Sequence, residues 1–326
     1  MKIIGIGNAL LDVLFRMEND DTLHVLGLRK GAMDIIDEAK MAEIQNLEKS
    51  LNSSKTPGGS VCNSMRSLAR LGANAGYIGK IGNDKSGSVY SEEIVKSGVT
   101  PFLVRMSGMS GCSTILVSPD GERTMATFLG LAATLSEDEI PDDVLKQYDC
   151  IYIEGYLISN DHLFLPVLRR AKNLGLKIAL DLSNFNIVNG FKTLLKSVIP
   201  IYVDILFSNE NEAEAYTGLP ADKAIVEILK EVEIAVVTTG KRGALAGNKD
   251  IIVHEAALNA LVLDTTGAGD NFAAGFLYGY SKGALIKQSA QIGTLLAGNV
   301  IEVMGAQIEN ERWEDINLKV CEILRE

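Results

Sequence analysis

Short runs of β-branched and aliphatic residues alternate with longer helical patterns along most of this chain, and this alternation is the strongest constraint on its fold. Helix-length stretches span residues 161–174, 186–198 and 209–229, and the apolar runs are IIGIG near the start, CIYIEG from Cys150, KIALDL from Lys177, VDILFS from Val203 and IAVVTT from Ile234. Such alternation is typical of βαβ units. We therefore predict a mostly parallel sheet with helices on both faces.

Two segments depart from the alternation. Residues 10–36 and 99–129 are rich in strand formers and turns, and the second contains SPDGERT, in which Asp120-Gly121 is a hairpin signal. They either pair as a small separate sheet, serving as a lid or a dimer surface, or form ordinary edge hairpins. The pattern alone favours neither alternative.

Composition excludes several classes of protein. Of the 326 residues, 47% are hydrophobic and 22% charged, and the formal net charge of −11 argues against nucleic acid or an anionic membrane as the main partner. The four cysteines are isolated, which indicates neither a disulfide framework nor a zinc site. The opening MKIIGIGNALLD is interrupted by polar residues and predicts a core strand rather than a signal peptide. Because no apolar run reaches the ~18 residues of a membrane span, we expect a cytoplasmic protein.

Polar and glycine-rich residues follow the predicted strands. In open parallel sheets, ligands bind beyond the carboxyl ends of the strands. The residues found there are Asn8 and Asp12, Asp181, and the segments 209–212, 239–243 and 264–270. We expect them to share one rim.

The strongest local signal is DTTGAGD, residues 264–270, which precedes a helical pattern. Gly267, Ala268 and Gly269 would leave backbone N–H groups free at the start of that helix, and the helix dipole adds positive potential there, as in a phosphate cradle. Asp270 could be a plain N-terminal cap. A cap does not require three small residues, however, so we predict that Asp270 is the base that accepts a hydroxyl proton during phosphoryl transfer.

A second signal is PGGSVCN, residues 57–63, which leads into another helical run. Gly58 and Gly59 would let a ligand approach the backbone closely, and Asn63 can exchange hydrogen bonds with a polyol. The alternative is a flexible turn before a helix.

Two further segments carry weaker signals. Asn209 and Glu212, in NENEA, fit a network of Mg²⁺, water and phosphate, although acidic residues also favour a helix start through its dipole. Thr239, Gly240 and Gly243, in TTGKRG, could contact the phosphates or ribose of a nucleotide, or form only a hairpin turn.

Competing signatures are incomplete. Gly5-Ile6-Gly7 lacks the third glycine of a dinucleotide fingerprint because position 10 is Leu10, and no GxxxxGK[ST] motif occurs. The three histidines are scattered without metal spacing or a GxSxG partner, so we assign them no catalytic role.

Taken together, these motifs resemble the PfkB carbohydrate kinase family, also called ribokinase-like kinases. GGSVCNSMRSLARLG with the following IGKIGND resembles the family's first signature, and DTTGAGDNFAAGFL resembles its second. NENEA is similar to the family's NxxE element and VVTTGKRGA to its nucleotide loop. The order is that of the family, and the similarity runs from Lys2 to about Gln307.

The resemblance implies a three-layer α/β/α ribokinase-like fold, with a main domain over residues 1–9, 37–98 and 130–326 and a small β lid over 10–36 and 99–129. It also implies Mg-ATP as donor, Asp270 as base, and an anion hole from Gly267, Ala268 and Gly269. Substrate hydroxyls would contact Asp12, Gly58, Gly59 and Asn63. The nucleotide would contact Asn209, Thr239, Gly240 and Gly243.

The resemblance extends to metal ions. Glu212 would act on Mg²⁺ through water, and a monovalent cation such as K⁺ would bind Asp264, Thr266 and the carbonyl of Gly305. Arg123, in GERT on the lid, is a weaker candidate for a phosphate or lid-closure contact.

The opening GNALLDV is similar to the start of adenosine kinases, which makes adenosine or a related nucleoside the leading substrate. No aromatic pair that would hold a purine is evident, and a ribose- or fructose-like sugar is the alternative. A non-catalytic sugar- or nucleoside-binding regulator on the same scaffold is a third possibility. The lid could also join two copies of the chain as a homodimer.

Overall fold

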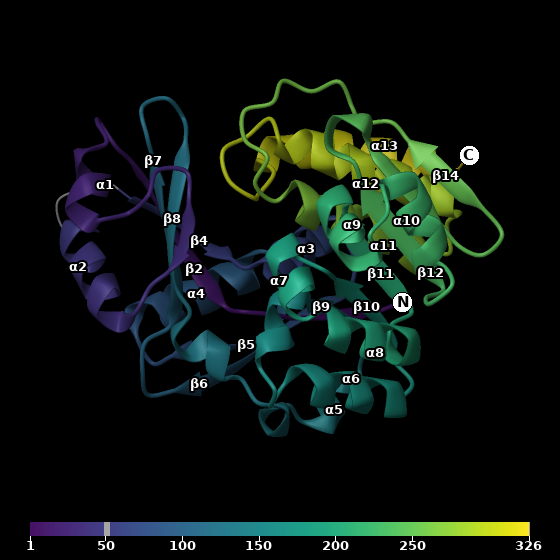
Figure 1. Cartoon of the computed structure of the whole chain (residues 1–326), viewed down its shortest axis with the longest axis horizontal. Helices are drawn as coiled ribbons and strands as arrows, with labels where there is room; N and C mark the ends of the chain where they lie inside the picture. The colour runs from purple at the N-terminus through teal and green to yellow at the C-terminus, as the bar shows by residue number, and fades with distance from the viewer. Residues whose placement is uncertain (49–52, 326) are drawn as a thin grey trace.

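The computed structural model describes residues 1–48 and 53–325, which form two sheets of nine and five strands. Figure 1 shows the smaller sheet at one side of the larger body, with α1 (Asp21–Leu26) and α2 (Glu38–Glu48) on its outer side. Within the described residues, no helix is long and apolar enough to cross a membrane.

The nine-stranded sheet confirms the predicted α/β architecture. All neighbouring strands pair in parallel except the two pairings that involve β13, at one edge. The five predicted runs are the strands β1, β9, β10, β11 and β12. The spatial order is β14 (Ile252–Glu255), β13 (Ala244–Gly247), β12 (Ile234–Thr238), β11 (Ile205–Asn209), β10 (Lys177–Asp181), β9 (Cys150–Glu154), β1 (Ile3–Ile6), β5 (Ala75–Gly82) and β6 (Thr100–Met106).

Helices cover both faces of this sheet, giving three layers. One face carries α3 (Ser60–Arg70), α4 (Lys85–Lys96), α11 (Ala268–Ser281), α12 (Ile286–Val300) and α13 (Trp313–Ile323). The other carries α5 (Asp142–Leu145), α6 (Phe164–Asn173), α7 (Phe185–Gly190), α8 (Lys192–Tyr202), α9 (Glu210–Thr217) and α10 (Ala221–Ile228).

The strands alternate between two hydrophobic cores. In β9, Cys150 and Tyr152 belong to the core beneath α3 and α11, whereas Ile151 and Ile153 belong to the core on the opposite face. All four are fully buried. Burying one isoleucine side chain contributes about 1.5–3 kcal/mol, so strands that are apolar on both faces fix the centre of the sheet.

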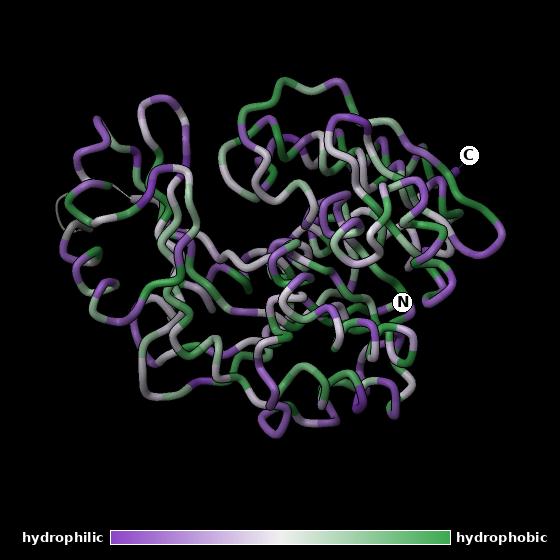
Figure 2. The backbone as a smooth tube through the Cα atoms, viewed as in Figure 1, coloured by the Kyte–Doolittle hydropathy of each residue, from purple (hydrophilic) through white to green (hydrophobic). Residues whose placement is uncertain are grey.

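The five-stranded sheet has the order β3 (Met33–Ile35), β8 (Arg123–Phe128), β7 (Gly111–Val117), β2 (Leu10–Arg16) and β4 (Ser53–Gly58). The predicted hairpin joins β7 to β8, and its turn is closed by the Ser118 N–H, which donates to the Glu122 carbonyl at 2.8 Å. Gly121 has φ +88°, a conformation that favours glycine. The tip of this hairpin is hydrophilic in Figure 2.

The membership of the two sheets differs from the predicted domain boundaries in two places. β4, expected in the main domain, pairs antiparallel with β2, and β6, expected in the lid, pairs in parallel with β5. The residues of β4 are SSKTPG, a weak strand signal, and Pro57 is tolerated because β4 is an edge strand. β6 follows β5 through α4, so it completes a βαβ unit of the large sheet.

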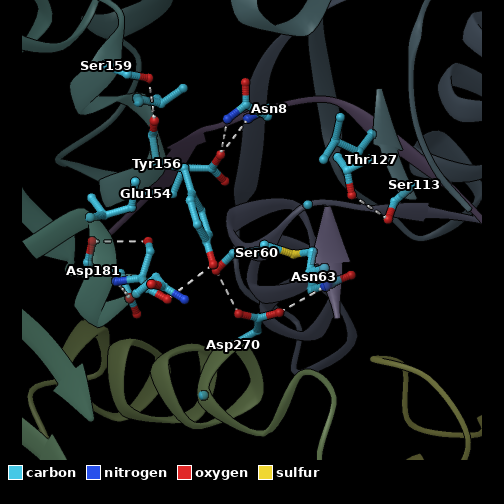
Figure 3. Close-up of a pocket in the computed structure, with 18 of the residues that line it drawn as sticks. Asn8, Ser60, Asn63, Ser113, Thr127, Glu154, Tyr156, Ser159, Asp181 and Asp270 are labelled. Atoms are coloured by element: carbon cyan, nitrogen blue, oxygen red, sulfur yellow. Dashed lines mark hydrogen bonds between the residues drawn. The ribbon is translucent and has the colours of Figure 1, made fainter. Parts of the chain in front are cut away.

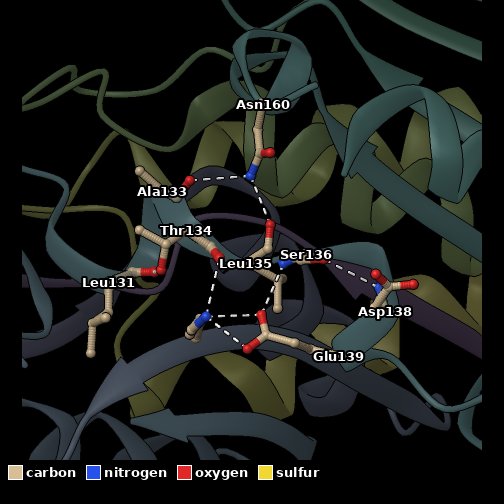
Figure 4. Close-up of polar contacts among 9 residues, drawn as sticks. Leu131, Ala133, Thr134, Leu135, Ser136, Asp138, Glu139 and Asn160 are labelled. Carbon is tan, nitrogen blue, oxygen red and sulfur yellow. Dashed lines mark hydrogen bonds and ion pairs between the residues drawn. The ribbon is translucent and has the colours of Figure 1, made fainter. Parts of the chain in front are cut away.

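The segment that leaves the small sheet after β8 is fastened to the main body (Figure 4). Lys80, buried on β5, donates to the Thr134 carbonyl at 3.1 Å and to both oxygens of Glu139 at 2.7 and 2.9 Å. Asn160 donates to the carbonyls of Ala133 and Leu135 at 3.1 and 2.7 Å. The Lys80 side chain is 5% exposed and that of Glu139 25%, so this partly buried ion pair and the hydrogen bonds of Asn160 together hold the small sheet to the large one.

Candidate active site

A cavity of about 870 Å³ is lined by residues of both sheets. The small sheet contributes Leu10, Asp12 and Met125, and the carboxyl ends of the large sheet contribute Glu154 and Asp181. Figure 3 shows Asn8, Asn63, Glu154, Asp181 and Asp270 around this space. This cavity is lined by part of the predicted rim, namely Asn8, Asp12, Asp181, Asn209, Glu212, Thr266, Gly269 and Asp270.

Asp270 lies in the first turn of α11, beside the cavity. Its Oδ1 accepts a hydrogen bond from Ser60 Oγ at 2.7 Å, and its Oδ2 accepts one from Asn63 Nδ2 at 2.9 Å. Both donors come from the start of α3, so the carboxylate is held between two helices. Gly267 occupies the N-cap position instead, and the side chain of Asp270 is not a cap.

The orientation of Asn63 is set by a residue that the sequence analysis did not select. Gln307 Nε2 donates to Asn63 Oδ1 at 3.0 Å, which leaves Asn63 Nδ2 facing Asp270. Ser64 Oγ donates to the Asp270 carbonyl at 2.8 Å and ties α3 to α11. Gln307 follows Ala306, which packs against Gly267. This proximity exists only in the folded chain, so no sequence signal identifies Gln307.

The predicted anion cradle is the turn that starts α11. Gly267 has φ +75°, and a Cβ there would lie 2.6 Å from Ala306 Cβ. A Cβ on Gly269 would meet nothing within 4 Å, and this residue lines the cavity, whereas Gly267 and Ala268 do not. Among the described residues, no acceptor pairs with the N–H groups of Gly269 and Asp270. Open space thus lies beside two unpaired donors at a helix start.

Gly58 and Gly59, just before α3, allow other parts of the chain to pack closely against their backbone. Gly59 has φ +92°, and a Cβ there would lie 2.4 Å from the Asn8 carbonyl oxygen. A Cβ on Gly58 would lie 2.2 Å from the carboxylate of Asp12. Gly58 itself does not line the cavity. Gly59 lines the cavity as well as approaching Asn8, whereas the close approach of Gly58 is to Asp12 within the protein.

Five carboxyl groups around the cavity have raised pKa values, chiefly because they are buried, and Asp270 is one of them. Burial and the charge of Asp270 raise the pKa of Asp12 to about 7, and burial raises the pKa of Asp181 to about 6. Burial raises the pKa of Glu154 to about 7, and burial together with the charge of Asp181 raises the pKa of Glu212 to about 8. The cavity therefore gathers carboxyl groups that are poised near neutral pH.

Glu154 is a candidate that sequence reasoning missed. It ends β9, is 1% exposed, and its Oε1 accepts from the Asn8 N–H at 2.9 Å and from Asn8 Nδ2 at 2.7 Å. The available signal was its place at the end of CIYIEG, on the predicted rim. Asp181, which was placed on the rim without a role, accepts from Tyr152 OH at 3.0 Å and from the Ser183 N–H at 2.7 Å.

Asn209 and Glu212 form a capping box at the start of α9. Glu212 accepts from the Asn209 N–H at 2.8 Å and from Asn209 Nδ2 at 2.6 Å, and it is 4% exposed. Both residues also line the cavity. Their hydrogen bonds are therefore those of a helix start. Because both residues also line the cavity, a ligand has room to lie beside them.

The predicted nucleotide loop forms a tight turn between β12 and β13. Thr239 Oγ1 donates to the Gly243 carbonyl at 3.0 Å, and a Cβ on Gly243 would lie 2.0 Å from the Glu255 carbonyl oxygen. Thr239, Gly240 and Gly243 do not line the 870 Å³ cavity, whereas Thr238 does. Thr239 borders a separate hollow of about 410 Å³ together with Arg242 and His254.

The predicted monovalent-cation residues come together, but their geometry does not fit a cation. The Asp264 carboxylate accepts from the N–H and Oγ1 of Thr266 at 3.1 and 2.8 Å and from the Gly305 N–H at 2.6 Å. Arg123 completes the set, with NH2 2.5 Å from Asp264 Oδ2. Gly305 contacts Asp264 through its N–H, whereas the prediction concerned its carbonyl. A cation would instead need oxygen ligands free of donors.

Comparison with known proteins is consistent with this geometry. Residues 31–313 match the model of the pfkB family carbohydrate kinases. An uncharacterized sugar kinase of Archaeoglobus fulgidus is 31% identical over 74% of this chain and 96% of its own length. An adenosine kinase of Saccharomyces cerevisiae is 27% identical over 95% of this chain and 97% of its own.

Solved structures agree in fold over almost the whole chain. The crystal structure of a probable sugar kinase from Rhizobium etli superposes with a TM-score of 0.87 at 29% identity, covering 99% of this chain and 98% of that one. Adenosine kinase from Sinorhizobium meliloti gives 0.85 at 30% identity, covering 98% and 99%. The chain belongs to the pfkB family of carbohydrate kinases. It is a phosphotransferase of the sugar and nucleoside kinase group.

Proposed function

We propose that this kinase transfers the γ-phosphoryl group of ATP to a primary hydroxyl of a nucleoside, with adenosine as the leading substrate. The observation that carries this proposal is the position of Asp270. Its carboxylate borders the cavity beside the unpaired N–H of Gly269, so a proton acceptor and an anion site are adjacent. Those are the two requirements of phosphoryl transfer to an alcohol.

In the proposed reaction the substrate hydroxyl gives its proton to Asp270. The hydroxyl oxygen forms a bond to the γ-phosphorus as the bond to the β,γ-bridging oxygen breaks, and ADP leaves. The N–H groups of Gly269 and Asp270, at the start of α11, stabilise the charge on the transferring group. Ser60 and Asn63 hold the carboxylate in place before the proton arrives.

The donor would be Mg-ATP, as kinases of this family use ATP and typically a divalent metal. Burial is the main cause of the raised pKa values of Glu212 and Asp181. A magnesium ion with its waters would supply a positive charge that favours their ionised forms. Within residues 1–48 and 53–325, no three His, Cys, Asp or Glu side chains converge on a metal position. Glu212 would therefore act through water. Asn209 and, less directly, the turn of Thr239, Gly240 and Gly243 would border the nucleotide.

A nucleoside is favoured over a simple sugar because one wall of the cavity is apolar. The small sheet and the residue after it contribute five aliphatic or thioether side chains, which are Leu10, Met33, Ile35, Met125 and Leu129. Met33 and Ile35 are 51% and 71% exposed, so they offer a surface that a heterocyclic base would cover. Asp12 and Asn63, on the polar side, would then take the ribose hydroxyls.

The alternatives are a ribose- or fructose-like sugar as acceptor, and a non-catalytic binding protein. A homodimer through the lid would have to use strand edges or α1 and α2, because those helices lie on the outer side of the small sheet (Figure 1). The relatives named adenosine kinase and sugar kinase leave the acceptor open.

The test is an ADP-release assay on the purified protein with Mg-ATP and a matched panel of adenosine, other nucleosides, ribose and fructose. We expect the highest kcat/KM with a purine nucleoside, and the product should carry the phosphate on the primary hydroxyl. A variant with Ile35→Asn should lose affinity for the nucleoside and leave the weak turnover of ribose unchanged. Higher kcat/KM for a sugar would replace the nucleoside assignment, and ligand-induced stabilisation without any turnover would identify a binding protein.

A further inference from the structure

Arg123 reaches from the small sheet to the loop that carries the anion cradle. Its NH2 lies 2.5 Å from Asp264 Oδ2 and its NH1 donates to Thr266 Oγ1 at 2.9 Å. The side chains of Arg123 and Asp264 are 13% and 7% exposed, so this is a largely buried ion pair. Arg123 NH2 also lies 4.0 Å from the sulfur of Met304.

The contacts occupy the oxygens on which a cation would depend. Asp264 Oδ1 takes two donors from Thr266, and Asp264 Oδ2 takes the Gly305 N–H and the guanidinium. Thr266 Oγ1 is likewise engaged, since it donates to Asp264 and accepts from Arg123. A second positive charge at this point would be repelled by the charge of the guanidinium.

We propose that Arg123 takes the place of a monovalent cation beside the anion cradle, so that this enzyme neither binds nor needs K⁺ there. This inference rests on the proposed kinase function, because the charge matters only if phosphate occupies the cradle. Asp264 lies three residues before Gly267 and Thr266 directly before it, so a positive charge fixed on them supports the turn that presents the N–H groups of Gly269 and Asp270.

A positive charge that comes from Arg123 rather than from a dissolved ion has a second consequence. A dissolved ion would be independent of the small sheet, whereas Arg123 is the first residue of β8. The small sheet, which lines the cavity, therefore also supplies the charge. Because an arginine offers two donors in a fixed plane, it fixes the distance between β8 and the cradle loop as well as the charge.

The experiment is thermal unfolding of the full chain, without substrate, in equal ionic strengths of potassium chloride and tetramethylammonium chloride. The wild-type protein should unfold at the same temperature in both salts. Arg123→Met uncovers Asp264, which still has its three other donors, and its Tm should be about 2 °C or more higher in K⁺. Arg123→Lys retains a positive charge and should remain insensitive to K⁺.

Two further variants locate the effect. Adding Asp264→Asn to Arg123→Met should abolish the response to K⁺, and Arg29→Met, which removes an arginine that is 79% exposed in the loop between α1 and β3, should give none. A K⁺-dependent Tm in the wild-type protein overturns the proposal, as does an Arg123→Met variant that ignores K⁺. These readouts need no turnover, so they stand even if the proposed reaction fails. With turnover, the wild-type rate should be equal in the two salts.

Discussion

Asn63 contacts Asp270 through its amide nitrogen, and Gln307 determines that orientation by donating to the amide oxygen. A carboxylate can only accept hydrogen bonds unless it is protonated, so the nitrogen is the atom that suits Asp270. If the Asn63 amide turned over, its oxygen would face the carboxylate and disfavour the ionised form. Gln307 is therefore a positioning residue for the proposed base, although it does not touch it.

Removing the donor of Gln307 should lower turnover more than it lowers stability. In Gln307→Leu the Asn63 amide can rotate, and we expect kcat to fall roughly fivefold, the cost of one lost hydrogen bond of about 1 kcal/mol. The acidic limb of the pH–kcat profile should move to higher pH. Gln147→Leu, on an exposed side chain, is the matched control. If kcat and the acidic limb of the pH–kcat profile are both unchanged in Gln307→Leu, Asn63 does not need the hydrogen bond from Gln307 to keep its orientation.

The pH dependence of turnover should report Asp270. Burial raises the pKa of Asp270, while the hydrogen bonds from Asn63 and Ser60 lower it by favouring the charged form. The base must be ionised, so turnover should fall as the pH drops through that pKa. Ser60→Ala removes one stabilising donor and should shift this limb upward by up to about 1 pH unit. A limb that stays in place, or moves to lower pH, would contradict this account of the electrostatics.

The stability of the ligand-free protein should decrease between pH 6 and pH 8. Burial raises the pKa of Glu154 from its ordinary 4.5 to about 7, so the folded state holds a proton that the unfolded state has released. The stabilisation from this protonated group is complete at low pH and is lost as the pH rises through 7, by about 1 kcal/mol over this window. Urea unfolding at both pH values measures it.

Glu154→Gln should reduce the loss of stability between pH 6 and pH 8 by about 1 kcal/mol, because the amide keeps the shape without titrating. Part of the dependence should remain, because Asp12, Asp181 and Glu212 also have raised pKa values near this window. Glu314→Gln, an exposed side chain on α13, is the control and should reproduce the wild-type slope. Wild-type stability that rises from pH 6 to pH 8 would show that the buried carboxyl groups are ionised and compensated in the folded protein.

The sequence predicted those features that depend on local pattern. The runs from Cys150, Lys177, Val203 and Ile234 became parallel strands because each carries its own β-branched, doubly buried pattern. The rim followed from them, since parallel strands end at the same edge. Asp270 was placed on that rim by the glycines before it, and the structure adds that Gly267 is the cap.

Features that depend on pairing between distant segments were not predictable. β4 has the weak strand sequence SSKTPG and is a strand because β2 pairs with it. Glu154 resembles any glutamate at the end of a strand until burial singles it out. The contact of Arg123 with Asp264 joins residues far apart in the chain, and the orientation of Gly305 depends on a backbone conformation with φ +92°.

The central claim is that Asp270 accepts the proton of the acceptor hydroxyl, and the most direct measurement is the steady-state rate of Asp270→Asn with Mg-ATP and the best acceptor. We expect kcat to fall by about 10²–10⁴-fold, while acceptor-induced thermal stabilisation remains close to that of the wild type. Asp250→Asn, at an exposed turn, should retain full activity. An Asp270→Asn variant that turns over the same acceptor at the wild-type rate would contradict the claim.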